Sequence, residues 1–212
     1  MIFDYLKFHY PICYYKDVLY NAYMEILKEN YIEKAEKYPK NYKPSSIPLE
    51  NLLSKYNIKL DDINKIKGLD NFGVENAIIY QQNKYTFIKG VDKNRVSINK
   101  VDILNSKIIH SHPMGSSFSK ADIDDILLYG GDELIAFNDN YFYFFKNNLK
   151  SYNSIYDTIA TIIDETTKSL NLKIERGELS KSEFDFIIPH LVWQKVSKLE
   201  EGFIYESYAI SK

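Results

Sequence analysis

The chain has 212 residues, of which 45% are hydrophobic and 26% are charged, a globular composition that excludes disordered, fibrous and collagen-like proteins. Its formal net charge of −2, with Lys supplying nearly all of the basic residues, argues against a nucleic-acid-binding protein. The chain has a single cysteine, Cys13, and lacks an apolar run of about 18 residues. We therefore expect no intramolecular disulfide, no membrane span and a cytoplasmic location.

The first third of the chain is predicted to be helical. Apolar residues recur at steps of three and four over residues 16–38, which predicts an amphipathic helix. The proline-containing stretch 39–48 interrupts this pattern, and Ser46 within it is a candidate N-cap for a short helix. Another short helix is expected over residues 60–66. Residues 1–67 are therefore interpreted as a helical N-terminal segment.

The centre of the chain mixes strand and helix patterns. A helix is predicted over residues 121–129, because its apolar residues share one face and two glycines follow it. Strands are predicted over residues 77–90, 96–103, 106–109 and 133–146. The first and the last of these stretches are each expected to form a hairpin. The expected fold class is therefore α+β, with the β-sheet and its packed helix in residues 68–150.

The last part, residues 151–212, is predicted to be a helical C-terminal segment. An apolar stripe that begins at Ile155 predicts one helix, and Ser180 with Glu183 forms a capping-box pattern for a second that ends near Glu200. The apolar face around Trp193 on this second helix must be buried against the core or against another chain. The helical flanks are thus packing elements or surfaces for a protein partner.

Two closely spaced histidines provide the chemical signal of the sequence. Side chains at positions i and i+2 of a strand project to the same face, so His110 and His112 can converge on one divalent ion. Asp122, in the first turn of the following helix, can supply a carboxylate, with Asp125 as the alternative ligand one turn later. Three protein ligands leave a coordination position open, which is typical of catalytic Zn²⁺ sites.

Other interpretations of these residues remain open at this stage. Ser119 and Asp122 also match an ordinary helix start, with a hydroxyl N-cap followed by an acid in the first turn. The two further histidines, His9 and His190, stand alone in the sequence and are interpreted as structural residues.

The run His110-Ser111-His112-Pro113, followed by Ser119-x-x-Asp122, resembles the JAMM (JAB/MPN+) metalloprotease signature. It is closest in motif style to RadC-like proteins and to JAB domains of phage- and toxin-associated bacterial proteins. The resemblance implies a JAB/MPN-like, cytidine-deaminase-like sheet over residues 68–150. In this chain six residues separate His112 from Ser119, one fewer than in the family pattern.

The resemblance also implies roles for individual residues. The family has a glutamate at the start of a strand upstream of the histidines, and Glu75 matches that place; Glu50 and Glu133 are weaker candidates. Glu75 would act as general base, and Ser119 would stabilise the oxyanion. His110, His112 and Asp122 would hold Zn²⁺.

Three functions follow from these observations as hypotheses. The first is a zinc-dependent peptidase or isopeptidase that acts on a peptide or protein substrate. The second is a JAB-like binding or scaffold module without turnover. The third is a RadC-like protein connected with DNA processing, which the weakly acidic charge balance disfavours.

Overall fold

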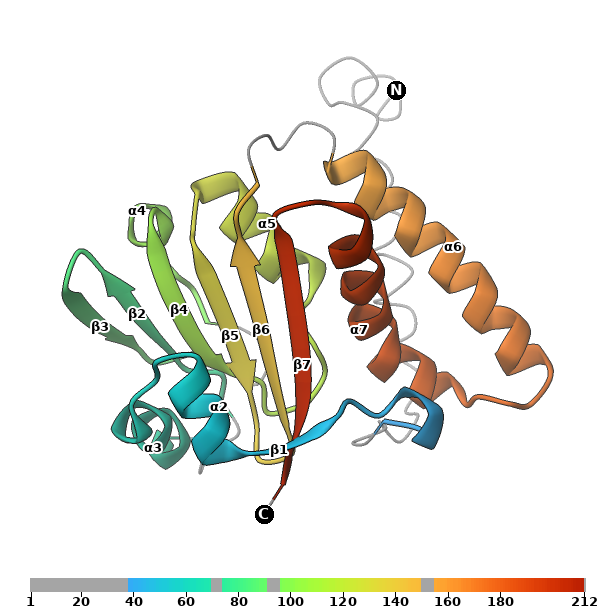
Figure 1. Ribbon diagram of the computed structural model, residues 1–212, viewed down its shortest axis with the longest axis horizontal. Helices are drawn as coiled ribbons and strands as arrows, with labels where there is room; N and C mark the ends of the chain where they lie inside the picture. Colours follow the sequence, from blue (N-terminus) through green and yellow to red (C-terminus); the bar gives the residue numbers. More distant parts are fainter. Residues whose placement is uncertain (1–37, 70–73, 91–95, 150–154, 212) are drawn as a thin grey trace, which may run out of the picture. The chain divides into compact units, whose positions relative to one another are not determined.

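One mixed β-sheet organises the chain, and helices pack against both of its faces (Figure 1). The computed structural model describes residues 38–69, 74–90, 96–149 and 155–211. The sheet contains seven strands, which are β1 (Ser46–Pro48), β2 (Ala77–Gln81), β3 (Lys84–Ile88), β4 (Ser106–Ser111), β5 (Glu133–Phe137), β6 (Tyr141–Asn147) and β7 (Phe203–Ser211). Their spatial order is β1-β7-β6-β5-β4-β2-β3, with β1–β7 and β4–β5 parallel and the other neighbours antiparallel. The expected α+β class is confirmed.

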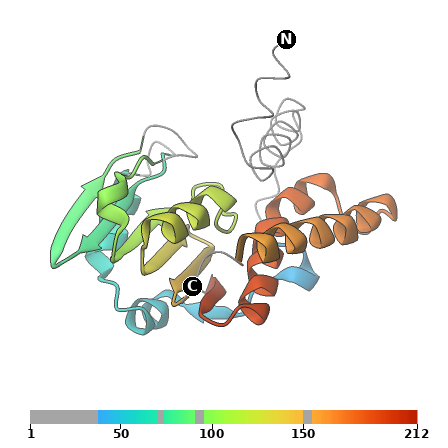
Figure 2. The ribbon, with the colours of Figure 1, turned by 90° about the horizontal axis from the view of Figure 1, so that it is seen from above.

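The helices form a layer on each side of the sheet. The helical elements in the described ranges are the 3₁₀ turn η2 (Lys40–Tyr42), α2 (Leu49–Lys55), α3 (Leu60–Leu69), α4 (Lys100–Ile103), α5 (Lys120–Tyr129), α6 (Ile155–Glu175) and α7 (Lys181–Leu199). Helices α2 and α3 pack on one face, whereas α5, α6 and α7 pack on the other, and Figure 2 shows α2 and α5 on opposite sides of the sheet. Within the described ranges, no helix has the length and apolar character that crossing a bilayer requires.

Strand β6 shows how the two apolar layers meet at the sheet. Tyr143 and Phe145 point into the layer of α5, α6 and α7, and Phe142 and Phe144 point into the layer of α2 and α3. Because both faces are covered, residues 141–145 of this strand are all aromatic and do not alternate between apolar and polar side chains. Burying each such ring contributes roughly 1.5–3 kcal/mol relative to leaving it exposed.

Several elements lie where the sequence predicts them. Helix α5 begins at Lys120 and ends at Tyr129, and the Gly130 that follows adopts a left-handed conformation with φ 70°. The hairpin of β5 and β6, the hairpin of β2 and β3, and the capping box of Ser180 and Glu183 at the start of α7 are all present. These features depend on neighbouring residues, so local sequence patterns are sufficient to locate them.

Two local predictions were wrong. Residues 96–103 do not form a strand: α4 begins at Lys100, because the Asn99 side chain accepts a hydrogen bond from the backbone N of Val101 and caps a helical turn. Ser46 does not cap a helix either, since it lies in β1 and pairs with Ala209 of β7. The helix predicted over 16–38 lies outside the described residues, apart from Tyr38.

The C-terminal segment is not helical throughout. After α7 the chain enters β7, which pairs antiparallel with β6 and parallel with β1. The sheet therefore takes strands from all three of the predicted segments. The sequence of β7 lacks a clear alternation of apolar and polar residues, because both faces of the strand are packed. Phe203 and Tyr205 lie on one face, and Ile204 and Tyr208 lie on the other.

Candidate metal centre

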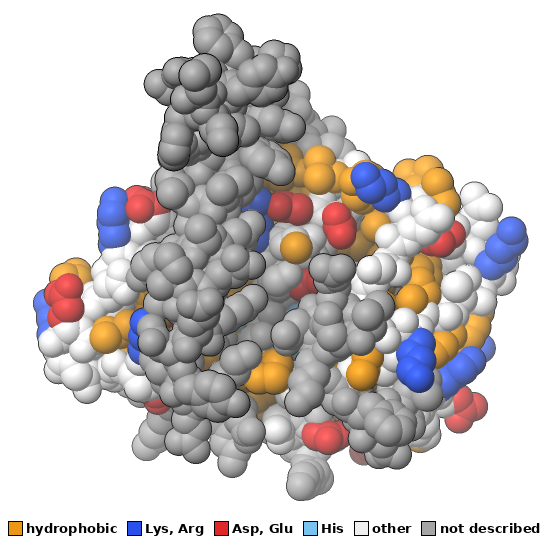
Figure 3. All heavy atoms as spheres, turned by 180° about the vertical axis from the view of Figure 1, so that it is seen from behind, with side chains coloured by type: hydrophobic (Ala, Val, Ile, Leu, Met, Phe, Trp, Pro, Cys, Tyr) orange, Lys and Arg blue, Asp and Glu red, His pale blue; other side chains and the backbone are white. Residues whose placement is uncertain are grey.

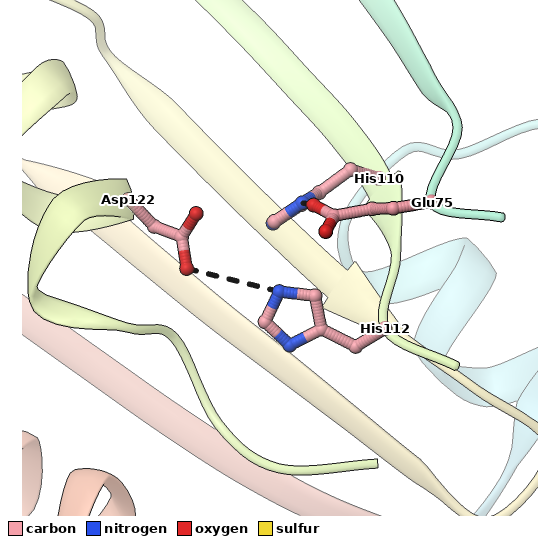
Figure 4. Close-up of side chains that lie close together, drawn as sticks. All are labelled: Glu75, His110, His112 and Asp122. Carbon is pink, nitrogen blue, oxygen red and sulfur yellow. Dashed lines mark hydrogen bonds and ion pairs between the residues drawn. The ribbon is translucent and has the colours of Figure 1, made fainter. Parts of the chain in front are cut away.

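The antiparallel pairing of β2 with β4 brings Glu75 to the histidines. Ala77, the first residue of β2, lies opposite His110 near the end of β4. Glu75, two residues before Ala77, therefore lies beside the residues that follow His110. His110 and His112 are two positions apart and share a face. The loop after His112 leads into α5, whose first turn carries Asp122, and the four side chains converge (Figure 4).

The four residues Glu75, His110, His112 and Asp122 form a cluster that can hold a metal ion. Each offers a ligand atom, and these atoms all lie within 4.8 Å of one another. Nε2 of His112 lies 3.7 Å from Oδ2 of Asp122, and the two imidazole rings have centroids 4.5 Å apart. His110 and Glu75 are buried, whereas the Asp122 side chain is 23% exposed. Solvent therefore reaches the cluster on the Asp122 side.

Hydrogen bonds at Nδ1 set the orientation of both imidazoles. Nδ1 of His110 donates to Oε1 of Glu75 at 2.7 Å, and Nδ1 of His112 donates to the carbonyl of Ser116 at 2.8 Å. In the neutral ring the other nitrogen, Nε2, then carries the lone pair. Metal-binding histidines in proteins are held in the same way by a carboxylate or a backbone carbonyl.

The atoms of the cluster fit a transition-metal cation. Nε2 of His110 is buried and lacks a hydrogen-bond partner among the described residues. Leaving such an atom unsatisfied costs roughly 1–3 kcal/mol, a cost that a bound cation offsets. Two imidazole nitrogens with carboxylate oxygens are a donor set that suits Zn²⁺ better than Mg²⁺ or Ca²⁺, which prefer oxygen alone.

No protein family model, curated protein or solved structure matches this chain. The chemistry of the cluster therefore has to follow from its own atoms and their surroundings.

The charges around the two histidines shift their pKa values in opposite directions. Burial lowers the pKa of His110, but the hydrogen bond and the charge of Glu75 outweigh it, and the net shift is upward. Burial and the neighbouring His110 lower the pKa of His112, against a partial opposing effect of Asp122. The neutral imidazole is the form that binds metal, so the lowered pKa of His112 favours binding there, whereas at His110 a metal cation would compete with a proton for Nε2.

Asp122 combines helix capping with its place in the cluster. The Ser119 hydroxyl accepts a hydrogen bond from the backbone N of Asp122 at 3.2 Å, and Oδ2 of Asp122 accepts one from the backbone N of Ser119 at 2.6 Å. The ordinary helix-start interpretation of this pair is therefore confirmed. The same Oδ2 faces His112, so the cap also aims the carboxylate at the cluster. Ser119 itself is exposed.

Of the other acids considered from the sequence, Asp125 lies near the cluster, whereas Glu50 and Glu133 lie away from it. Asp125 is exposed one turn further along α5 and is not part of the group of ligand atoms in the described chain. Glu50 is exposed on α2, which packs on the opposite face of the sheet. Glu133 lies at the start of β5, at the far end of the strands from His110, and forms ion pairs with Lys107 and Lys146.

A small open pocket adjoins the cluster and is lined by both polar and aliphatic side chains. His110 and Asp122 form one side, and Asp125 lies beside them. Its other walls are Val96, Ile98, Ile103, Ile108, Ile126 and Leu134.

Sequence reasoning missed the residues that hold the loop between His112 and α5. Ser117 of this loop is buried and hydrogen-bonded to Tyr205, which is 88 positions away in the chain. Neither a motif nor a periodicity connects such distant residues. The signal appears only once β7 is paired into the sheet.

Proposed function

We propose that this chain is a zinc-dependent hydrolase that cleaves an amide bond of a peptide or an isopeptide bond of a protein. The observation that carries the proposal is the convergence of Glu75, His110, His112 and Asp122 on one small volume, with Nε2 of His110 buried and unpartnered among the described residues.

Three of the four residues would hold the metal. His110 and His112 would bind through Nε2, since their Nδ1 atoms are engaged by Glu75 and Ser116, and Asp122 would bind through its carboxylate. A bound Zn²⁺ supplies Lewis acidity that makes water nucleophilic near neutral pH and polarises a carbonyl. With three protein ligands, the fourth coordination position of the metal stays open for water or substrate.

Glu75 would act as the general base. Its Oε1 accepts a hydrogen bond from Nδ1 of His110, which leaves Oε2 to take the proton of the attacking water and to deliver it to the departing amine. Burial of Glu75 keeps competing solvent away from this proton transfer. The carboxylate therefore has two tasks, orienting His110 with one oxygen and moving a proton with the other.

Ser119 would stabilise the oxyanion that forms on the carbonyl. Its Oγ accepts the capping hydrogen bond from Asp122, so its own O–H remains available to donate. The hydroxyl is exposed to solvent beside the cluster, where a substrate can meet it. One donor of this kind is worth about 2.7–4 kcal/mol in other acyl-transfer enzymes.

The order of the elements supports a JAB/MPN-type centre. A glutamate precedes β2, the His-x-His pair lies at the end of β4, and Ser-x-x-Asp begins α5, in agreement with the JAMM-like motif. Against a nucleic-acid substrate, Lys and Arg side chains lie scattered over the described part of the face in Figure 3 and do not merge into a continuous basic patch there.

Metal analysis combined with a cleavage assay tests the proposal. We expect the purified protein to contain one equivalent of zinc and a His112→Ala variant to retain little. Incubated with a mixture of synthetic peptides and a Lys-linked isopeptide, the protein should generate new amino termini. The chelator 1,10-phenanthroline should abolish the cleavage, and added Zn²⁺ should restore it.

Two results would contradict the proposal. A native protein that neither contains nor takes up zinc would exclude the metal centre. A zinc-loaded protein that leaves all peptides and the isopeptide intact would favour the binding-module alternative. Urea unfolding of His112→Ala serves as the control that loss of zinc does not follow from loss of the fold.

A further inference from the structure

The loop of residues 113–118 between His112 and α5 is tied at four successive positions. Each of Gly115, Ser116, Ser117 and Phe118 makes one hydrogen bond to a side chain outside the loop. These bonds are Tyr143 Oη to Gly115 O at 2.7 Å, His112 Nδ1 to Ser116 O at 2.8 Å, Ser117 Oγ with Tyr205 Oη at 2.8 Å, and Trp193 Nε1 to Phe118 O at 2.7 Å.

The C-terminal elements supply two of these partners. Trp193 lies on α7 and Tyr205 on β7, and the Tyr205 hydroxyl lies between Ser117 and Nδ1 of His190, which is 2.9 Å away. Ser117, Tyr205 and His190 are all buried. Burial lowers the pKa of His190 to about 4 and raises the pKa of Tyr205, so the chain of three hydrogen-bonding groups is uncharged near neutral pH.

The loop is also packed against the cluster. The Phe118 ring is fully buried and nearly parallel to the His110 ring, with an interplanar angle of 9° and centroids 6.2 Å apart. Gly115 has φ 77°, and a Cβ there would lie 2.5 Å from Nδ2 of Asn138. The loop conformation is therefore over-determined by contacts on every side, as expected for a segment that places metal ligands.

We infer that Tyr205, supported by His190, is a positioning residue of the metal centre. By holding Ser117 it fixes the adjacent carbonyl of Ser116, which in turn orients the imidazole of His112. The inference rests on the proposed metal centre and assigns β7 and α7 a part in it. Apolar side chains could bury the same surface without three polar groups that need hydrogen-bond partners. The hydrogen bonds of Ser117, Tyr205 and His190 therefore serve to position the loop more than to stabilise the fold.

Cobalt binding by matched Tyr→Phe variants tests the inference. Tyr205→Phe removes the hydroxyl that faces the loop. Tyr208→Phe removes a hydroxyl from the same strand, but this one bonds Lys55 and Glu206 on the opposite face of the sheet. We expect the dissociation constant for Co²⁺ to rise about 10-fold in Tyr205→Phe, with altered d–d absorption, and to change less than about twofold in Tyr208→Phe.

A double-mutant cycle with Ser117→Ala separates placement from general stability. If Ser117 and Tyr205 act through their shared bond, the double variant should bind Co²⁺ about as weakly as either single variant. Urea midpoints of all variants report stability separately from metal affinity. A merely structural role would lower the midpoint of Tyr205→Phe and leave its affinity and absorption unchanged.

The possible failures are distinguishable. Tight Co²⁺ binding by the wild type, with Tyr205→Phe indistinguishable from Tyr208→Phe, overturns the positioning role and leaves the metal centre intact. Absence of Co²⁺ binding by the folded wild type overturns the metal centre and, with it, the role of Tyr205.

Discussion

Oδ2 of Asp122 faces two partners at once: Nε2 of His112 lies 3.7 Å away, and the backbone N of Ser119 donates to the same oxygen at 2.6 Å. The capping bond restricts the carboxylate to one rotamer, so the acid is placed before any cation arrives. Such pre-organisation reduces the entropy that a ligand would otherwise lose on binding.

The first prediction concerns the two acids of α5. Asp122→Asn should weaken zinc binding by at least about 100-fold, because it removes a charged ligand and not merely a supporting partner, whose loss costs about 10–100-fold. Asp125→Asn, one turn later and exposed, should leave the affinity unchanged. Competition with a chromogenic chelator measures both constants. An unchanged zinc affinity in Asp122→Asn would show that Asp122 is not a ligand.

The second prediction separates proton transfer from metal binding at Glu75. Glu75→Gln keeps the shape of the side chain and an oxygen that can accept from His110, but it cannot take a proton from water. Peptide cleavage should fall about 10²–10⁴-fold in kcat, and the zinc content should stay near that of the wild type. Glu50→Gln, on the opposite face of the sheet, is the matched control. Wild-type activity in Glu75→Gln would rule out its role as the base.

The third prediction uses two helices with the same cap. Ser119 and Ser180 both form capping boxes, at the starts of α5 and α7. Ser119→Ala and Ser180→Ala should each lower the free energy of unfolding by about 1 kcal/mol. Only Ser119→Ala should also lower kcat, by about 10²–10³-fold, because it alone removes the proposed oxyanion donor. Urea titrations and cleavage assays give the two quantities, and equal activities would refute the oxyanion role.

The fourth prediction concerns the pH dependence of stability. Burial lowers the pKa of His190 in the fold to about 4, while an unfolded histidine titrates near 6.5. Between these pH values His190 binds a proton in the unfolded chain but not in the folded chain. Its contribution to the free energy of unfolding is therefore complete above pH 6.5 and is lost as pH falls toward 4. The loss amounts to about 3 kcal/mol.

Urea unfolding at several pH values, with a chelator present, measures this contribution. The wild type should lose stability between pH 6.5 and 4 more steeply than His190→Gln, which cannot titrate there. Parallel curves for the two proteins would show that His190 is accessible to protons in the folded state.

The motif residues and their local elements were accessible from the sequence. The His110-x-His112 pair lies at the end of a strand, and Ser119 caps the helix that carries Asp122, because strand alternation and capping are decided within a few residues. Glu75 was indicated only by a family resemblance, since it lies 35 positions from His110.

Tertiary structure decided what lies around the motif. By itself the sequence determined which side chains could serve as ligands, because residue type and short spacing are local properties. The pairing of β2 with β4, which brings Glu75 to His110, and the entry of β7 into the sheet, which brings Tyr205 to Ser117, depend on contacts between distant segments. Many pairings satisfy the same apolar pattern, and only the packed sheet selects one of them.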